Sequence, residues 1–71
     1  MLDKEKILKH FGKNLKEARA KSGLSQERLA LDLGFDRTYI SLLERGKRNP
    51  SLFTIHKIAD FLEIDVSKLI N

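Results

Sequence analysis

Cysteine is absent from the 71-residue sequence, and proline occurs once, as Pro50. Without cysteine the chain has no disulfide framework, no thiolate zinc finger and no thiol nucleophile. No apolar run approaches the roughly 20 residues that a membrane-spanning helix needs. The first residues, MLDKEKIL, include acidic side chains and lack the apolar core of a signal peptide. We therefore expect a cytoplasmic protein that does not enter a membrane.

The length predicts one domain, residues 1–71, and the charge is unevenly distributed along it. A chain this short buries only about 60% of its unfolded surface, so dimerisation would add stability. Residues 1–50 hold 12 Lys and Arg against 7 Asp and Glu, whereas residues 51–71 hold 2 against 3. A basic body and a near-neutral tail suit nucleic acid on one side and a protein contact on the other. Modest basicity is also common in proteins with neither partner.

The stretch SQERLALDLGFDRTYISLLER, residues 25–45, predicts two short helices joined by a tight turn. Ser25 and Asp36 are residue types that cap helix starts, and Gly34 supplies the left-handed conformation that ends a helix. Phe35 would fill the corner. The apolar positions of the two helices are spaced for a common inner face, with small Ala30 allowing a close crossing. These positions are Leu29, Ala30, Leu33, Ile40 and Leu43. The pattern is that of a helix-turn-helix.

The second of these helices has an outward face rich in hydroxyl and guanidinium groups, the types that reach base edges and phosphates of DNA. This face comprises Arg37, Thr38, Ser41, Leu42 and Arg45, with Tyr39 at its shoulder. The pattern predicts that the face enters the major groove of double-stranded DNA. The alternative is an ordinary small bundle, because such bundles also contain capped amphipathic helices joined by glycine.

A longer helix should precede this pair, from a cap at Asp3 to about Lys21. Its apolar residues recur at helical spacing: Ile7, Leu8, Phe11, Leu15 and Ala18. Gly12 interrupts the pattern at a cost of about 1 kcal/mol relative to Ala, so we expect the first turns to fray or bend there.

A turn, GKRNP, follows the helix pair and carries Lys47, Arg48 and Asn49, which are all types that bond phosphate oxygens. Ser51 should cap a fourth helix, whose amide-rich start could hold a backbone phosphate or could simply be an ordinary cap. The inner face predicted for this helix is Leu52, Ile55, Ile58, Ala59 and Leu62.

Asp65 should cap a last short helix, residues 66–70, in which Val66 and Leu69 can pack inward. Exposed apolar clusters on small proteins usually mark a partner surface. We assign such a cluster to a two-fold homodimer interface made by Phe61, Ile64, Val66 and Ile70. The alternative for Phe61 is a place in the core, since helix faces can be broad.

Nothing in the sequence indicates an enzyme. His10 and His56 are far apart, and neither has a metal-ligand pattern or a matched nucleophile. Asp60, Glu63 and Asp65 are better interpreted as a solvated face and a cap than as a nuclease site. We expect no cofactor, no metal, no catalytic residue and no small-molecule ligand.

The run LKEARAKSGLSQERLALDLGFDRTYISLLERGKRNPSL resembles the Cro/C1-type (XRE) helix-turn-helix family of phage Cro and repressor proteins. The resemblance covers about residues 11–69. FDRTYISLLERGKRN followed by SLFTIHKIADFLEI is closest to the controller proteins of restriction–modification systems. It implies an all-α, five-helix, lambda-repressor-like domain that binds DNA as a homodimer.

The resemblance also implies roles for individual residues. Gln26 would bond a phosphate, and Arg37 and Thr38 would reach bases. Tyr39 would contact the DNA backbone or a distorted base step. Arg48 and Asn49 would lie along the backbone, with Arg48 able to reach a base at the groove edge. Two further positions match family features, since Arg19 and Glu44 match a partly buried salt bridge and Glu27 a contact with RNA polymerase in family activators. Leu42 departs from the pattern, because many members have a polar residue there.

The function that follows is a sequence-specific transcription regulator on a near-palindromic operator. It would regulate its own gene and a restriction–modification system, activating at low dose and repressing at high dose. The alternatives are a generic prophage or chromosomal repressor, a DNA-binding antitoxin with a protein partner, and a protein–protein module that has lost its groove contacts. Arg37, Arg45 and Arg48 argue against the last.

Overall fold

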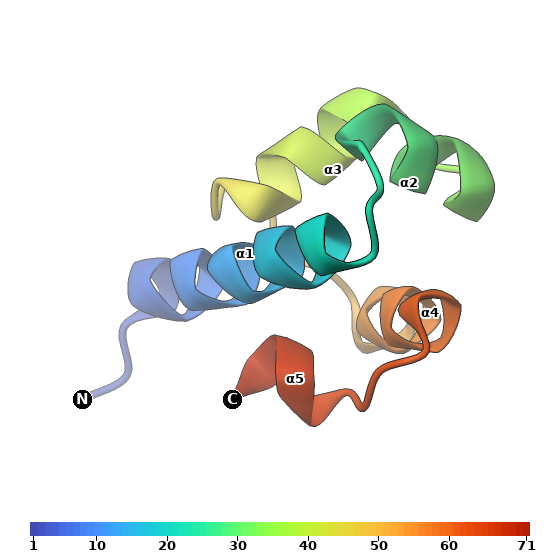
Figure 1. Ribbon diagram of the computed structural model, residues 1–71. Coiled ribbons are helices and arrows are strands. Elements are labelled where there is room, and N and C mark those ends of the chain that lie inside the picture. Colours follow the sequence, from blue (N-terminus) through green and yellow to red (C-terminus); the bar gives the residue numbers. More distant parts are fainter.

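The computed structural model describes residues 1–71 as five helices and no strand, which confirms the predicted all-α class. In chain order the helices are α1 (Lys4–Lys21), α2 (Gln26–Leu33), α3 (Arg37–Glu44), α4 (Leu52–Leu62) and α5 (Ser67–Ile70). Figure 1 shows α1 crossing the middle of the molecule, with α2 and α3 on one side of it and α4 and α5 on the other. The longest helix therefore lies between the helix pair and α5, while α4 also contacts α2. None of the five helices combines the length and the apolar character needed to cross a bilayer.

The first four helices begin where the sequence predicts. The side chains of Asp3, Ser25, Asp36 and Ser51 each accept a hydrogen bond from a first-turn backbone N–H, at distances of 2.8–3.2 Å. Such caps satisfy amides that have no partner within the helix. Gly34 ends α2 with φ 76°, a left-handed conformation that a residue with a Cβ rarely adopts.

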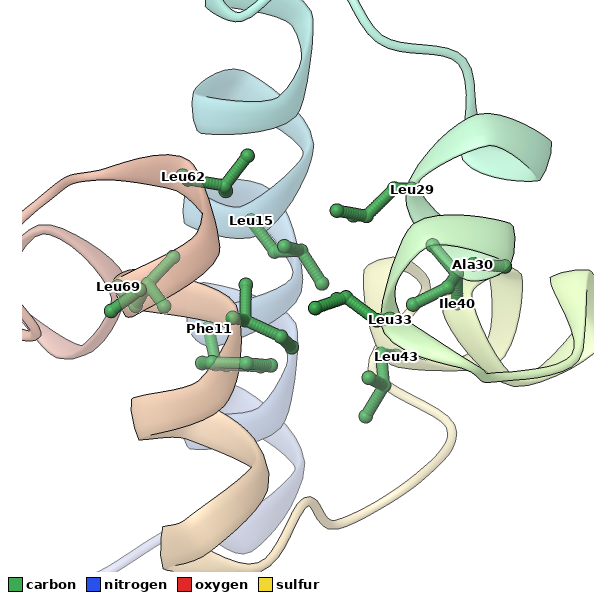
Figure 2. Close-up of a cluster of buried hydrophobic side chains, with 11 residues drawn as sticks. Phe11, Leu15, Leu29, Ala30, Leu33, Ile40, Leu43, Leu62 and Leu69 are labelled. Atoms are coloured by element: carbon green, nitrogen blue, oxygen red, sulfur yellow. The ribbon is translucent and has the colours of Figure 1, made fainter.

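One hydrophobic core joins α1 to the other four helices (Figure 2). Its buried side chains are Phe11, Leu15, Leu29, Ala30, Leu33, Ile40, Leu43, Ile58, Ala59, Leu62 and Leu69. Every helix contributes at least one of them, so no helix pair is held by its own contacts alone.

Gly12 lies where α1 crosses α3, and the prediction of fraying there is wrong. The helix is continuous from Lys4, and Gly12 is buried. A Cβ at this position would lie 2.5 Å from the backbone oxygen of Glu44 and 2.6 Å from that of Leu43. Glycine is therefore what allows the two backbones to approach, and its cost in helix propensity is offset by packing.

The prediction that Leu52 faces inward is also wrong, since its side chain is 71% exposed. The buried face of α4 consists instead of Thr54, Ile58 and Leu62, spaced by four, with Ala59 and half-buried Ile55 beside them. Leu52 lies two residues before Thr54. At 3.6 residues per turn this places it on nearly the opposite side of the helix.

The last helix is attached to α1 by polar contacts that the sequence does not indicate. His10 Nε2 lies 2.7 Å from the backbone oxygen of Asn71, and Asn14 Nδ2 donates to the backbone oxygen of Leu69 at 3.0 Å. These bonds hold the chain end over α1, with Leu69 fully buried beneath it.

Candidate nucleic-acid interface

The helix pair α2–α3 forms the predicted helix-turn-helix. Leu29 and Ala30 of α2 are buried together with Ile40 and Leu43 of α3 (Figure 2). Phe35 occupies the corner after Gly34 and packs against the core, as expected. The corner leaves one face of α3 turned away from α1.

A buried ion pair fixes the corner to α1. Arg19 Nε donates to Glu44 Oε2 at 2.6 Å, and Arg19 Nη2 donates to Glu44 Oε1 at 3.1 Å. The side chain of Glu44 is 2% exposed and that of Arg19 13%, so water screens this pair little. The hydrogen bond to Glu44 raises the pKa of Arg19 above its ordinary value. The predicted pairing of these residues is therefore confirmed.

The same carboxylate also holds the start of α2. Gln26 Nε2 donates to Glu44 Oε1 at 3.0 Å, and Arg19 Nη1 donates to the backbone oxygen of Leu24 at 2.7 Å. Glu44, the last residue of α3, thus accepts hydrogen bonds from side chains of two other helices. This network fixes the orientation of α3 relative to α1 and α2.

The outward face of α3 carries positive charge that no carboxylate of the chain neutralises. Arg37 and Thr38 are exposed at its first turn, Arg45 is exposed at its end, and Ser41 and Leu42 are half-buried between them. The only ion pairs in the protein are Glu5–Lys9, Arg19–Glu44 and Arg28–Asp32. The face therefore presents hydroxyls and guanidinium groups without a carboxylate partner to a ligand, with Arg45 Nε donating to the backbone oxygen of Ser41 at 3.4 Å.

An open hollow of about 530 Å³ lies between the starts of α2 and α3. It is lined only by polar residues, namely Arg19, Ser25, Gln26, Glu27 and Arg37. The structure thereby brings Gln26 and Arg37, eleven positions apart in the sequence, to one recess. An anion that entered it would meet the guanidinium of Arg37 and the amide of Gln26, and also the carboxylate of Glu27, which would repel it.

Four side chains beside this face form a row that we call the cation–aromatic stack: Lys57, Phe35, Tyr39 and Arg48. Lys57 Nζ lies 4.9 Å from the centre of the Phe35 ring. The Phe35 and Tyr39 rings meet edge to face, with centres 5.0 Å apart and planes at 64°. Arg48 Cζ lies 5.3 Å from the centre of the Tyr39 ring. Asn49, next to Arg48, is exposed.

The residues assigned to a dimer lie on another part of the molecule, at the end of α4, in the link that follows it and on α5. Phe61 is 38% exposed and Ile70 52% exposed. Ile64 and Val66 are half-buried and pack partly against the core of their own chain. In Figure 1 this region lies across α1 from α3. A partner could therefore bind there without covering the outward face of α3.

A capped two-helix corner, held rigidly to a third helix and presenting a free basic face, defines a helix-turn-helix DNA-binding domain. Comparison with known proteins agrees. The helix-turn-helix family model matches residues 15–69, and the chain belongs to this family. It is a DNA-binding transcription regulator related to restriction–modification controller proteins.

Individual relatives cover most of the chain. The control protein C.MunI from a Mycoplasma species is 48% identical over 60 residues, which is 83% of this chain and 81% of the relative. C.BamHI from Bacillus amyloliquefaciens is 44% identical over 62 residues, covering 86% of this chain and 76% of the relative. The crystal structure of the controller protein C.AhdI from Aeromonas hydrophila superposes with a TM-score of 0.82 at 48% identity, covering 87% and 94% of the two chains. The predicted resemblance to controller proteins is therefore confirmed.

Proposed function

We propose that the protein, a single domain over residues 1–71, binds a near-palindromic operator as a homodimer. Each subunit inserts α3 into one major groove, and the two half-sites lie about one helical turn apart. The observation that carries this proposal is the outward face of α3. Its charges are unneutralised, and its position is fixed by the bidentate Arg19–Glu44 pair.

Within this complex Arg37 and Thr38 read bases, because they are the exposed side chains at the leading turn of α3. A bidentate Arg–guanine pair contributes about 1–3 kcal/mol of discrimination. Gln26 donates one amide hydrogen to Glu44, and its second amide hydrogen is left for a phosphate oxygen.

The remaining interface residues of this proposal set the register on the duplex. They contact the DNA backbone or the groove wall, and they are Tyr39, Ser41, Arg45, Arg48 and Asn49. Such contacts fix orientation without carrying sequence information.

The dimer of this proposal is formed through Phe61, Ile64, Val66 and Ile70. Two exposed apolar side chains, one on α4 and one on α5, and two half-buried ones in the link between these helices support it. Burial of apolar surface contributes about 25 cal/mol per Å², so a small domain gains stability by association.

The regulated genes in this proposal include the protein's own gene and a restriction–modification system, activated at low dose and repressed at high dose. The identity with C.MunI and C.BamHI supports this branch of the family. Glu27 is exposed on α2 and is the proposed contact with RNA polymerase. The protein acts in the compartment that holds the DNA, which we take to be the cytoplasm, and it is not an enzyme.

A gel shift of the purified protein on the DNA just upstream of its own gene, repeated at several salt concentrations, tests the proposal. We expect sequence-dependent binding by two subunits, weakened steeply by salt because phosphate contacts release counterions. Weak binding that is indifferent to sequence, by a protein that still dimerises, would favour a protein-partner module. Tight binding next to genes other than a restriction system would favour a prophage or chromosomal repressor or an antitoxin.

A further inference from the structure

Arg48 is held by an aromatic ring and by nothing else. Its side chain is exposed, and it forms no ion pair and no hydrogen bond within the chain. Its guanidinium lies over the ring of Tyr39. A contact with the face of a ring occupies none of the five N–H donors, so all of them remain free for an anion.

The ring of Tyr39 is in turn held by contacts with neighbouring side chains. The edge-to-face contact with Phe35 restrains its ring, and the ammonium of Lys57 covers the Phe35 ring. Phe35 is half-buried against the core, and Lys57 precedes Ile58, which is fully buried on α4. Tyr39, like Phe35, also packs partly against the core, so the cation–aromatic stack connects Arg48 to the body of the protein.

We propose that Phe35 and Lys57 are positioning residues for DNA binding, which act through Tyr39 to hold the Arg48 guanidinium ready for a backbone phosphate. This inference rests on the proposed function. A long exposed side chain ordinarily loses conformational freedom when it binds, and that loss weakens affinity. A guanidinium already placed by a ring loses less. Neither Phe35 nor Lys57 needs to touch the DNA to contribute.

The effect can be isolated with a double-mutant cycle. The probe is a fluorescent 30-base-pair duplex that the wild-type protein selects from a random-sequence pool, with binding measured by anisotropy. We expect Phe35→Leu, which keeps an apolar side chain but removes the ring, to weaken binding about threefold. In an Arg48→Ala background the same substitution should weaken binding by a clearly smaller factor, because only its effect on the DNA contact of Tyr39 itself remains.

Phe53 provides the matched control, because it is an exposed ring of the same chain outside the stack. Whatever Phe53→Leu does to affinity, its effect should be the same with and without Arg48. Lys57→Gln is a second variant, at a half-exposed position where folding is not at risk. It should weaken binding about twofold in the wild-type background and have a smaller effect in the Arg48→Ala background. If Lys57 acted only through its positive charge, the loss of affinity would be equally large in the Arg48→Ala background.

Two further measurements distinguish positioning from a direct contact. Arg48→Ala should reduce the slope of log affinity against log salt by about 1.8, which corresponds to one phosphate contact in each of the two subunits, whereas Phe35→Leu should leave the slope unchanged. In the free protein, the ring current of Tyr39 should shift the NMR signals of the Arg48 side chain, and Phe35→Leu should reduce that shift.

Equal losses from Phe35→Leu with and without Arg48 would overturn the inference, since Phe35 would then act on α3 as a whole. An Arg48 side chain with random-coil shifts in the free protein would overturn it as well. If the wild-type protein selects no sequence and binds no duplex, that result instead refutes the proposed function on which the inference depends.

Discussion

Replacing Gly12 with alanine tests the packing of α1 on α3, on which the position of the proposed recognition helix depends. The added Cβ would lie 2.5 Å from the Glu44 oxygen, 2.6 Å from the Leu43 oxygen and 2.8 Å from the Glu44 carbonyl carbon. All three are backbone atoms, so no side chain can rotate to make room. Restoring a contact of about 3.4 Å requires α1 and α3 to separate by about 0.9 Å.

Two opposing terms decide the result. Alanine favours the helix over glycine by about 1 kcal/mol. Overpacking of a close interface costs about 1–3 kcal/mol, and separation of the helices also loosens the contacts of Phe11 and Leu15. We therefore expect Gly12→Ala to lower the free energy of unfolding by about 1–2 kcal/mol. For a domain of this size that is a fall in melting temperature of about 5–15 °C.

The assay is thermal unfolding followed by circular dichroism at a fixed protein concentration. Lys16 supplies the control, because it is exposed in the same helix, and a comparison of Lys16→Ala with Lys16→Gly measures propensity without packing. A Gly12→Ala protein that melts above the wild type, by the amount measured at position 16, would refute the close approach. A modest loss of stability together with a larger loss of DNA affinity would show that the shift reaches α3.

Four other perturbations have expected outcomes. Arg37→Ala should keep the fold and lose discrimination at one base pair of each half-site, by about 1–3 kcal/mol in a binding series over all four bases; wild-type selectivity would exclude it as the reader. Glu44→Ala leaves a buried guanidinium unpaired and should lower the free energy of unfolding in urea by about 3–5 kcal/mol; a loss below 1 kcal/mol would mean that water screens the pair. Ile70→Asp should weaken the dimer first and DNA binding second in sedimentation, and an unchanged dimer mass would contradict our interface. The Ser67 backbone N–H holds the pKa of Asp65 below its ordinary value of 3.8, so its stabilising contribution is complete above that value and is lost as the pH falls further; Asp65→Asn should flatten this part of a curve of melting temperature against pH, and an unchanged curve would exclude this role.

Features of the fold that depend on local sequence could be predicted. A cap needs one side chain and an amide two or three residues away, so Ser25, Asp36 and Ser51 can be recognised without knowing the rest of the structure. The inner faces of α2 and α3 follow from helical spacing for the same reason. The Arg19–Glu44 pair is different, because it joins residues 25 positions apart, and only the family resemblance predicts it.

Features that depend on tertiary approach could not be predicted. From helical periodicity one can infer only that Gly12 lowers helix propensity. Glycine is needed there because the backbone of another helix approaches closely, which the local sequence does not show. Leu52 lies on the side of α4 that is turned away from the core, so an apolar residue there has nothing to pack against. His10 and Asn14 bond backbone oxygens of the chain end, and backbone acceptors leave no trace in a sequence.

The candidate interface also has one part that the local sequence predicts and one part that depends on tertiary contacts. The residue types on the outer face of α3 follow from its sequence, because an eight-residue helix has one inner face and its other positions must turn outward. Whether those side chains are ready to bind depends on neighbours from elsewhere in the chain. Arg48 stacks on Tyr39, Tyr39 meets Phe35, and Lys57 arrives from α4 to complete the stack. Two related chains with identical α3 helices can therefore differ in DNA affinity through positions 35 and 57, which a comparison of recognition helices alone would overlook.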